Sequence, residues 1–177
     1  MSTSETPYRT YARVAGFTFL FYIVAGISSM ALPDKSQVAD LINLLLNFSA
    51  IVLGVTLFMI TREQGPGLAL LALTCRILEA VHSESAIFFA VGSLLFSWLL
   101  LRGRMIPVAL AWLGVLASVL WVVGLPLQLI GILPDSVTWF IYIPMAAFEI
   151  PFALWLLIKG VALSTLNGVP PRVAQVP

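Results

Sequence analysis

The residues best suited to chemistry gather in one stretch, residues 75–85 (CRILEAVHSES), which lies between two long apolar runs. The stretch holds the only cysteine and the only histidine of the chain, together with Arg76, Glu79 and Glu84. A charge near the middle of a membrane costs about 2.5–3.5 kcal/mol on insertion scales. These charges therefore need partners, and the rest of the chain has to supply them.

Arg76 lies roughly 12–14 Å along its predicted helix from Gly67, which is well inside the hydrocarbon. We expect it to face the bundle interior and to have a carboxylate partner. Glu79 follows at i+3, on the same helix face. Glu149 is about midway along the last apolar run, so its depth matches that of Arg76. One cation beside two carboxylates implies a net negative cluster or one protonated carboxyl.

Other polar side chains are expected either at the depth of Arg76 or closer to the outer face of the membrane. Asn43 and Asn47 share one face of a helix at i, i+4 spacing. Gln128 is near the outer end of the fifth apolar run, and His82 belongs to the turn between the third and fourth. We predict a polar cavity that opens toward the outer face and is closed toward the cytoplasm. The residues predicted for this polar core or ligand site are Arg76, Glu79, Glu149, His82, Asn43, Asn47 and Gln128.

Two interpretations of this polar core stand side by side. The core binds a small ligand or a proton, as ionisable residues inside membranes often do. Alternatively, the buried charges only lock helix register, and the protein is a non-catalytic scaffold or accessory subunit. An enzyme is the least favoured class, because no nucleophile motif is recognisable and no catalytic residue is predicted.

Residue counts exclude several kinds of site. A single histidine excludes bis-histidine haem within one chain, and neither a histidine pair nor a cysteine pair is present for a closed zinc site. Glycine-rich phosphate loops are also absent. We therefore predict no cofactor and no metal ion.

The composition is that of a membrane protein. The chain has 177 residues, of which 60% are hydrophobic and 10% charged, whereas soluble domains carry about 25% charged residues. Its mean hydropathy is +1.05. The net charge of +1 and the lack of a basic run predict no nucleic-acid partner. The expected partners are membrane lipids and, in addition, a small-molecule ligand or a partner membrane protein. The sequence does not predict the oligomeric state.

Apolar runs of about 20 residues predict an all-α, six-helix transmembrane bundle with short loops. The run 68–101 would extend ~50 Å as one helix, so we divide it at residues 82–85. The whole chain is expected to form one membrane domain with a disordered tail at about 164–177. The predicted spans are 13–32, 38–60, 68–81, 86–101, 106–132 and 137–158.

Cations support this count. With six spans and the N-terminus inside, the outer loops hold Lys35 alone, which is the positive-inside pattern. A single helix over 68–101 would move Arg102 and Arg104 outside and break the pattern. We therefore expect both termini in the cytoplasm and the protein in a bacterial inner membrane. The inner segments hold Arg9, Arg13, Arg62, Arg102, Arg104, Lys159 and Arg172.

Pairs of small residues at i, i+4 spacing are expected where helices approach closely. They occur at Ala12/Gly16, Ala50/Gly54 and Gly114/Ser118.

Several short segments, in this order and spacing, resemble an uncharacterised bacterial multi-pass membrane family, domain of unknown function 4386. The resemblance covers roughly residues 13–161. It implies the helical architecture, and since no activity is assigned to that family it implies no chemistry. The segments that carry it are Arg13-Val-Ala-Gly16, Arg76-Ile-Leu-Glu79-Ala80, Arg104-Met-Ile-Pro107, Phe148-Glu149 and Trp155-Leu-Leu-Ile-Lys159-Gly160.

Overall fold

The computed structural model describes residues 5–33, 36–81, 85–134 and 137–162, and within these ranges the chain forms six α-helices and no strand. The predicted all-α fold with short loops is thereby confirmed. The helices are α1 (Glu5–Met30), α2 (Gln37–Thr61), α3 (Pro66–Val81), α4 (Ser85–Arg102), α5 (Val108–Leu129) and α6 (Thr138–Ile158). The predicted tail at 164–177 lies outside the described residues.

Four of the described helices are long and apolar enough to cross a membrane, by length and composition. Their apolar segments are Pro7–Ser29, Gln37–Thr61, Val108–Leu129 and Phe140–Ile158. The other two helices are shorter: α3 has 16 residues and α4 has 18, which correspond to about 24 and 27 Å. The first helix begins at Glu5, earlier than the predicted start of the first span at Arg13.

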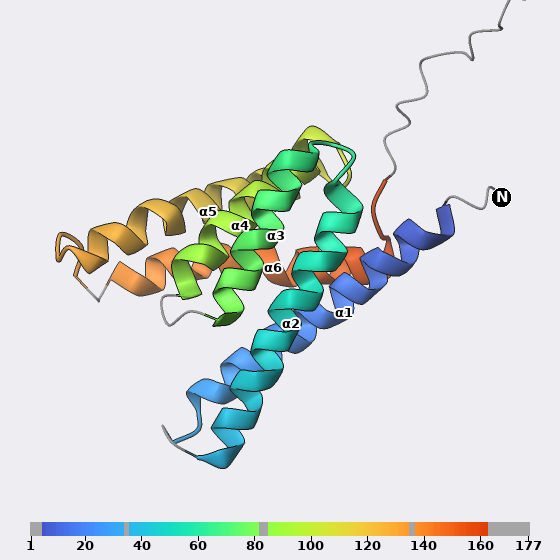
Figure 1. The fold of residues 1–177 in the computed structure, drawn as a ribbon. Helices are drawn as coiled ribbons and strands as arrows, with labels where there is room; N and C mark the ends of the chain where they lie inside the picture. The colour runs from blue at the N-terminus through green and yellow to red at the C-terminus, as the bar shows by residue number, and fades with distance from the viewer. Residues whose placement is uncertain (1–4, 34–35, 82–84, 135–136, 163–177) are drawn as a thin grey trace, which may run out of the picture.

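The helices form a closed ring. Each helix packs against its neighbours along the chain, and α1 packs against α6, which completes the circle. Successive helices run in opposite directions, so residue 5 and residues 159–162 lie at one end, the terminal end, with loops 62–65 and 103–107. The opposite end, which we call the loop end, holds the last residues of α1, α3 and α5 and the first residues of α2, α4 and α6. Figure 1 shows the α1/α2 and α5/α6 hairpins diverging toward the loop end, with α3 and α4 between them.

Proline, serine and glycine set the helix ends. Pro66 occupies the first turn of α3, where its missing N–H is not needed. Ser36 caps α2, since its Oγ accepts a hydrogen bond from the Ala39 backbone N–H at 3.0 Å. Gly160 follows the end of α6 with a φ of +76°, a conformation that favours glycine.

Small residues allow the close helix packing that the i, i+4 pairs predict. A Cβ added to Gly16 would lie 2.7 Å from the carbonyl oxygen of Ala153 on α6, so these two backbones almost touch. A Cβ on Gly114 of α5 would lie 2.6 Å from the ring of Phe148. A Cβ on Gly54 of α2 would lie 2.8 Å from the Arg76 Cβ on α3. The expectation of close approach is confirmed at all three glycines.

The terminal end is closed by side chains and by contacts between loops. Phe152 stacks on Phe148 at 5.0 Å between ring centroids and meets the edge of Phe19 at 5.8 Å. The backbone N–H of Ala162 donates to the carbonyl of Met105 at 2.8 Å, which ties the segment after α6 to the α4–α5 loop. Aromatic contacts thus join α1 to α6 in the half of the bundle nearer this end.

Candidate functional site

Arg76 is the largest fully buried side chain among the described residues, with 1% of its surface exposed. Its stem passes between two glycines of neighbouring helices. A Cβ on Gly54 of α2 would lie 2.8 Å from the Arg76 Cβ, and a Cβ on Gly92 of α4 would lie 3.5 Å from its Cδ. The long side chain can enter the ring interior because no side chain stands at either position.

The guanidinium of Arg76 pairs with the carboxylate that the sequence predicts. Arg76 Nη1 donates to Glu79 Oε2 at 2.6 Å, and both side chains are buried. The ring of Phe89 on α4 faces the guanidinium, with 4.9 Å from Cζ to the ring centroid, and Tyr22 lies at 5.9 Å. Such cation–π contacts are worth about 0.5–2 kcal/mol. The predicted buried salt bridge is confirmed.

Tyr22 of α1 completes the network, and sequence reasoning missed it. Its hydroxyl donates to Glu79 Oε1 at 2.8 Å, so each oxygen of the Glu79 carboxylate has a donor. The available signal was position, because Tyr22 lies in the middle of an apolar span, whereas tyrosines of membrane helices gather at the interfaces. We call Tyr22, Arg76 and Glu79 the charged network.

Glu149 of α6 has a different environment. Its Oε1 is buried and has no hydrogen-bond partner among the described residues. The side chain interacts electrostatically with Arg76 and Glu79, but no ion pair joins it to Arg76. Arg76 Nε is also buried without a partner. The structure thus leaves one donor and one acceptor unused beside a pair that is already neutral.

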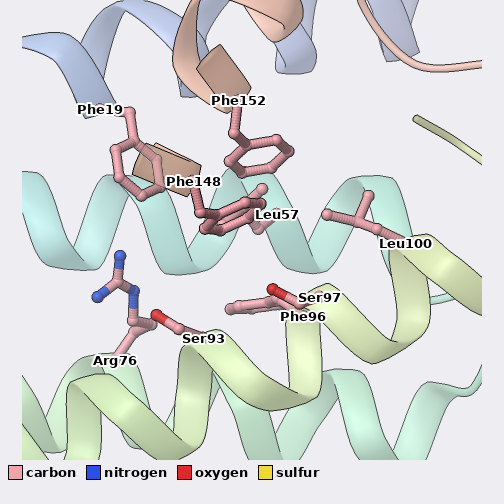
Figure 2. Close-up of a pocket in the computed structure, with 9 residues that line it drawn as sticks. All are labelled: Phe19, Leu57, Arg76, Ser93, Phe96, Ser97, Leu100, Phe148 and Phe152. Carbon is pink, nitrogen blue, oxygen red and sulfur yellow. The ribbon is translucent and has the colours of Figure 1, made fainter. Parts of the chain in front are cut away.

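A small pocket extends from Arg76 toward the terminal end. Figure 2 shows Arg76 and Ser93 at one end of it, Leu100 at the other, and the rings of Phe19, Phe148 and Phe152 across from them. The volume of the pocket is about 10 Å³. A cavity needs roughly 10–15 Å³ to hold one water molecule. The pocket is mainly apolar and points away from the loop end, so it is not the outward-opening cavity predicted from the sequence.

Three of the remaining predicted site residues lie on helices other than α1 and α3, which carry the charged network. Asn43 and Asn47 lie exposed on α2, and Gln128 is half-buried near the end of α5. His82 lies outside the described residues, as does Glu84. Their roles in a ligand site stay predictions.

No group of three metal-binding side chains (His, Cys, Asp or Glu) occurs among the residues that the structure describes. Cys75 is a buried free thiol between α3 and α4. The chemistry available at the site is therefore that of carboxyl, guanidinium and phenol groups.

Comparison with known proteins identifies one family. Residues 83–160 match the family described as domain of unknown function (DUF4386). The matched segment contains Glu149 and the Arg104–Pro107 segment, whereas Tyr22, Arg76 and Glu79 lie before it. No curated protein and no solved structure matches the chain. The predicted resemblance to this uncharacterised family is thereby confirmed over residues 83–160.

Proposed function

We propose that this membrane protein binds a proton, or a small ligand in its place, at a buried polar centre formed by Glu149 and the charged network. The observation that carries the proposal is the buried Oε1 of Glu149, which has no hydrogen-bond partner among the described residues. An unsatisfied polar atom in a native interior calls for an explanation, and a bound ion, a bound water or a catalytic role is among the usual ones.

The charge count supports a proton in particular. Arg76 is neutralised by Glu79 at 2.6 Å, so Glu149 adds an unpaired carboxyl to the interior. An isolated ionised carboxylate in an apolar medium is very unfavourable, and such a group takes up a proton or finds a cation. A protonated Glu149 would also become a hydrogen-bond donor.

Access is proposed from the loop end. The α1/α2 and α5/α6 hairpins diverge there, whereas phenylalanine rings fill the interior at the terminal end. This arrangement supports the expectation of a polar path that opens on the outer side.

Infrared spectroscopy of the protein in lipid nanodiscs tests the proposal. We expect a carboxylic-acid C=O stretching band that changes with pH or on addition of ligand, and that Glu149→Gln abolishes. Glu63→Gln is the control, since Glu63 is an exposed carboxylate at the terminal end. If wild type and Glu149→Gln give the same carboxyl bands at every pH, Glu149 does not hold the exchangeable proton.

The alternative function, a scaffold or accessory membrane subunit, is favoured by one observation. Both oxygens of Glu79 have donors, one from α1 and one from α3, so the Glu79 carboxylate joins these two helices without any ligand. In that case Glu149→Gln and wild type would behave alike in cells, while disruption of Glu79 would prevent assembly with a partner.

We also propose that both termini face the cytoplasm of a bacterial inner membrane. Six exposed cations at the terminal end support this orientation, because cytoplasmic loops are enriched in Lys and Arg. They are Arg9, Arg13, Arg62, Arg102, Arg104 and Lys159.

Thiol labelling in intact cells tests this orientation. In a Cys75→Ser background, Gln37→Cys at the loop end should react with a membrane-impermeant reagent, and Gly67→Cys should react only after lysis. The reverse labelling pattern would place the termini outside.

A further inference from the structure

The loops at the terminal end contact one another and the start of α1. The hydroxyl of Tyr8 on α1 donates a hydrogen bond to the Glu63 carboxylate in the α2–α3 loop. The next residue of that loop, Gln64, packs against the α4–α5 loop, because a Cβ added to Gly103 would lie 2.8 Å from Gln64 Cδ. These contacts join the start of α1 to both loops.

The segment after α6 completes a circuit with these elements. The backbone N–H of Ala162 donates to the Met105 carbonyl in the α4–α5 loop at 2.8 Å. Gly160 lies beside α1, since a Cβ added to it would be 3.8 Å from the Ala12 Cβ. The start of α1, the two loops and the segment after α6 therefore lie side by side around the terminal end.

The six exposed cations of the terminal end follow this circuit. Each is next in the sequence to a residue that makes one of the contacts, and none forms an ion pair with the residues that the structure describes. The acidic residues of this end are Glu63, which Tyr8 engages, and Glu5 at the first position of α1. Positive charge is therefore in excess on this surface. The cations are Arg9, Arg13, Arg62, Arg102, Arg104 and Lys159.

Two tryptophans indicate the depth of these charges. Trp98 precedes Arg102 by one turn of α4, and Trp155 precedes Lys159 by one turn at the end of α6. Each cation thus lies about 6 Å beyond its tryptophan along the helix axis. Tryptophan gathers at the headgroup level of a membrane, and Trp98 is 45% exposed. The positive surface therefore lies at the depth of lipid phosphates.

Arg104 has a backbone conformation that arginine rarely adopts. Its φ of +49° lies in the left-handed region that favours glycine. This conformation ends α4, where the Met105 N–H donates to the Leu100 carbonyl at 3.0 Å. Glycine would make the same turn without strain, so the turn does not explain why a charged side chain stands there.

We propose that the terminal end is a binding surface for the phosphate headgroups of anionic phospholipids. Phosphate oxygens accept the charge-assisted hydrogen bonds that arginine and lysine donate. Each basic residue near an anionic membrane surface strengthens the attraction about fivefold. The contacts between the loops gather the cations of four segments on one surface. This proposal rests neither on the function proposed for Glu149 nor on the side of the membrane that the termini face.

Native mass spectrometry of the full chain tests the proposal. The protein is released from micelles that contain equal amounts of phosphatidylglycerol and phosphatidylcholine with the same acyl chains. We expect phosphatidylglycerol to be enriched about fivefold or more among the bound lipids at low salt. The enrichment should decrease as the ionic strength rises, because salt screens exposed charges.

Arg104→Gly is the most informative variant, because glycine fits the left-handed backbone and the fold should be retained. It should lower the enrichment about two- to fivefold, while the melting temperature in phosphatidylcholine stays at or above that of the wild type. Arg104→Lys keeps the charge and should keep the enrichment. Lys35→Gln is the matched control, since it removes one cation from the connection between α1 and α2 and should leave the enrichment unchanged.

Three results would overturn the proposal. One is equal binding of the two lipids by the wild-type protein at low salt. Another is the same loss of enrichment in Arg104→Gly and Lys35→Gln, which means that total charge and not this surface attracts the lipid. The third is the same loss in Arg104→Lys and Arg104→Gly, which means that the charge at this position does not bind the headgroup.

Discussion

The two buried charged regions of the protein, one around Arg76 and one around Glu149, differ in the partners that surround the charged group. Arg76 is inserted between the glycines of α2 and α4, paired with Glu79 and faced by Phe89. Glu149 has a buried oxygen with no partner among the described residues. Four helices, α1 to α4, contribute residues to the surroundings of Arg76, and none of their described residues donates a hydrogen bond to the buried Glu149 oxygen.

The difference separates structural from functional charge. In the buried Arg76–Glu79 pair the two charges compensate each other, and removing one member leaves the other uncompensated. A buried carboxyl without a donor is a liability for stability, so its presence favours a role in binding. This contrast predicts opposite consequences for changing Glu79 and Glu149.

The largest effect is expected for Glu79→Ala. Removing this carboxylate leaves Arg76 buried without its counter-ion, and such losses cost about 3–5 kcal/mol. Unfolding in mixed micelles should show this decrease in the free energy of unfolding. Glu63→Ala, which removes the same charge at an exposed position, should cost less than about 1 kcal/mol. Equal effects of the two changes would mean that Arg76 does not depend on Glu79.

Tyr22→Phe should have the next largest effect. It removes the hydroxyl that donates to Glu79 Oε1 at 2.8 Å, and hydrogen bonds to charged groups contribute about 1.5–3 kcal/mol. The same unfolding measurement checks it. Tyr11→Phe on the same helix is the control and should leave stability nearly unchanged. If the two tyrosine variants match, the network needs only the ion pair.

Gly54→Ala should destabilise the protein, because the added methyl group would clash with Arg76 on α3. The added methyl group would lie 2.8 Å from the Arg76 Cβ, which cannot swing away as the end of a flexible side chain could. Overpacking of this kind costs about 1–3 kcal/mol. Gly26→Ala is the matched control on α1, because nothing lies within 4 Å of its added Cβ. A neutral Gly54→Ala would show that α2 and α3 can separate without cost.

The smallest effect on stability is expected for Glu149→Gln. The amide keeps the shape of the side chain and removes the unpaired acid, so the free energy of unfolding should change by less than about 1 kcal/mol. The exchangeable proton should nevertheless be lost. A destabilisation as large as that of Glu79→Ala would place Glu149 in the structural lock and remove the contrast between the two sides.

Much of the architecture was predictable because lipid imposes simple rules on sequence. The division at residues 82–85 follows from helix length and from the placement of Arg102 and Arg104, and two separate helices, α3 and α4, confirm it. The Arg76–Glu79 pair was also predictable, because residues at i and i+3 share a helix face whatever surrounds them.

Contacts between helices distant in the chain were not predictable. Tyr22 is 57 residues from Glu79, and only the packing of the ring brings its hydroxyl to that carboxylate. The same packing forms no ion pair between Glu149 and Arg76 despite their matched depth.

The sequence by itself therefore determined which segments are apolar, that they form six helices, and that a buried arginine has its carboxylate one turn away. These are properties of hydropathy and helical period, which act locally. Only the tertiary structure decided which polar atoms are satisfied, because a hydrogen bond between helices depends on their rotation and tilt. Rotation and tilt are set by close contacts, such as that of Gly16 in α1 with α6 and that of Gly54 in α2 with α3. Hydropathy and helical period leave these contacts undetermined.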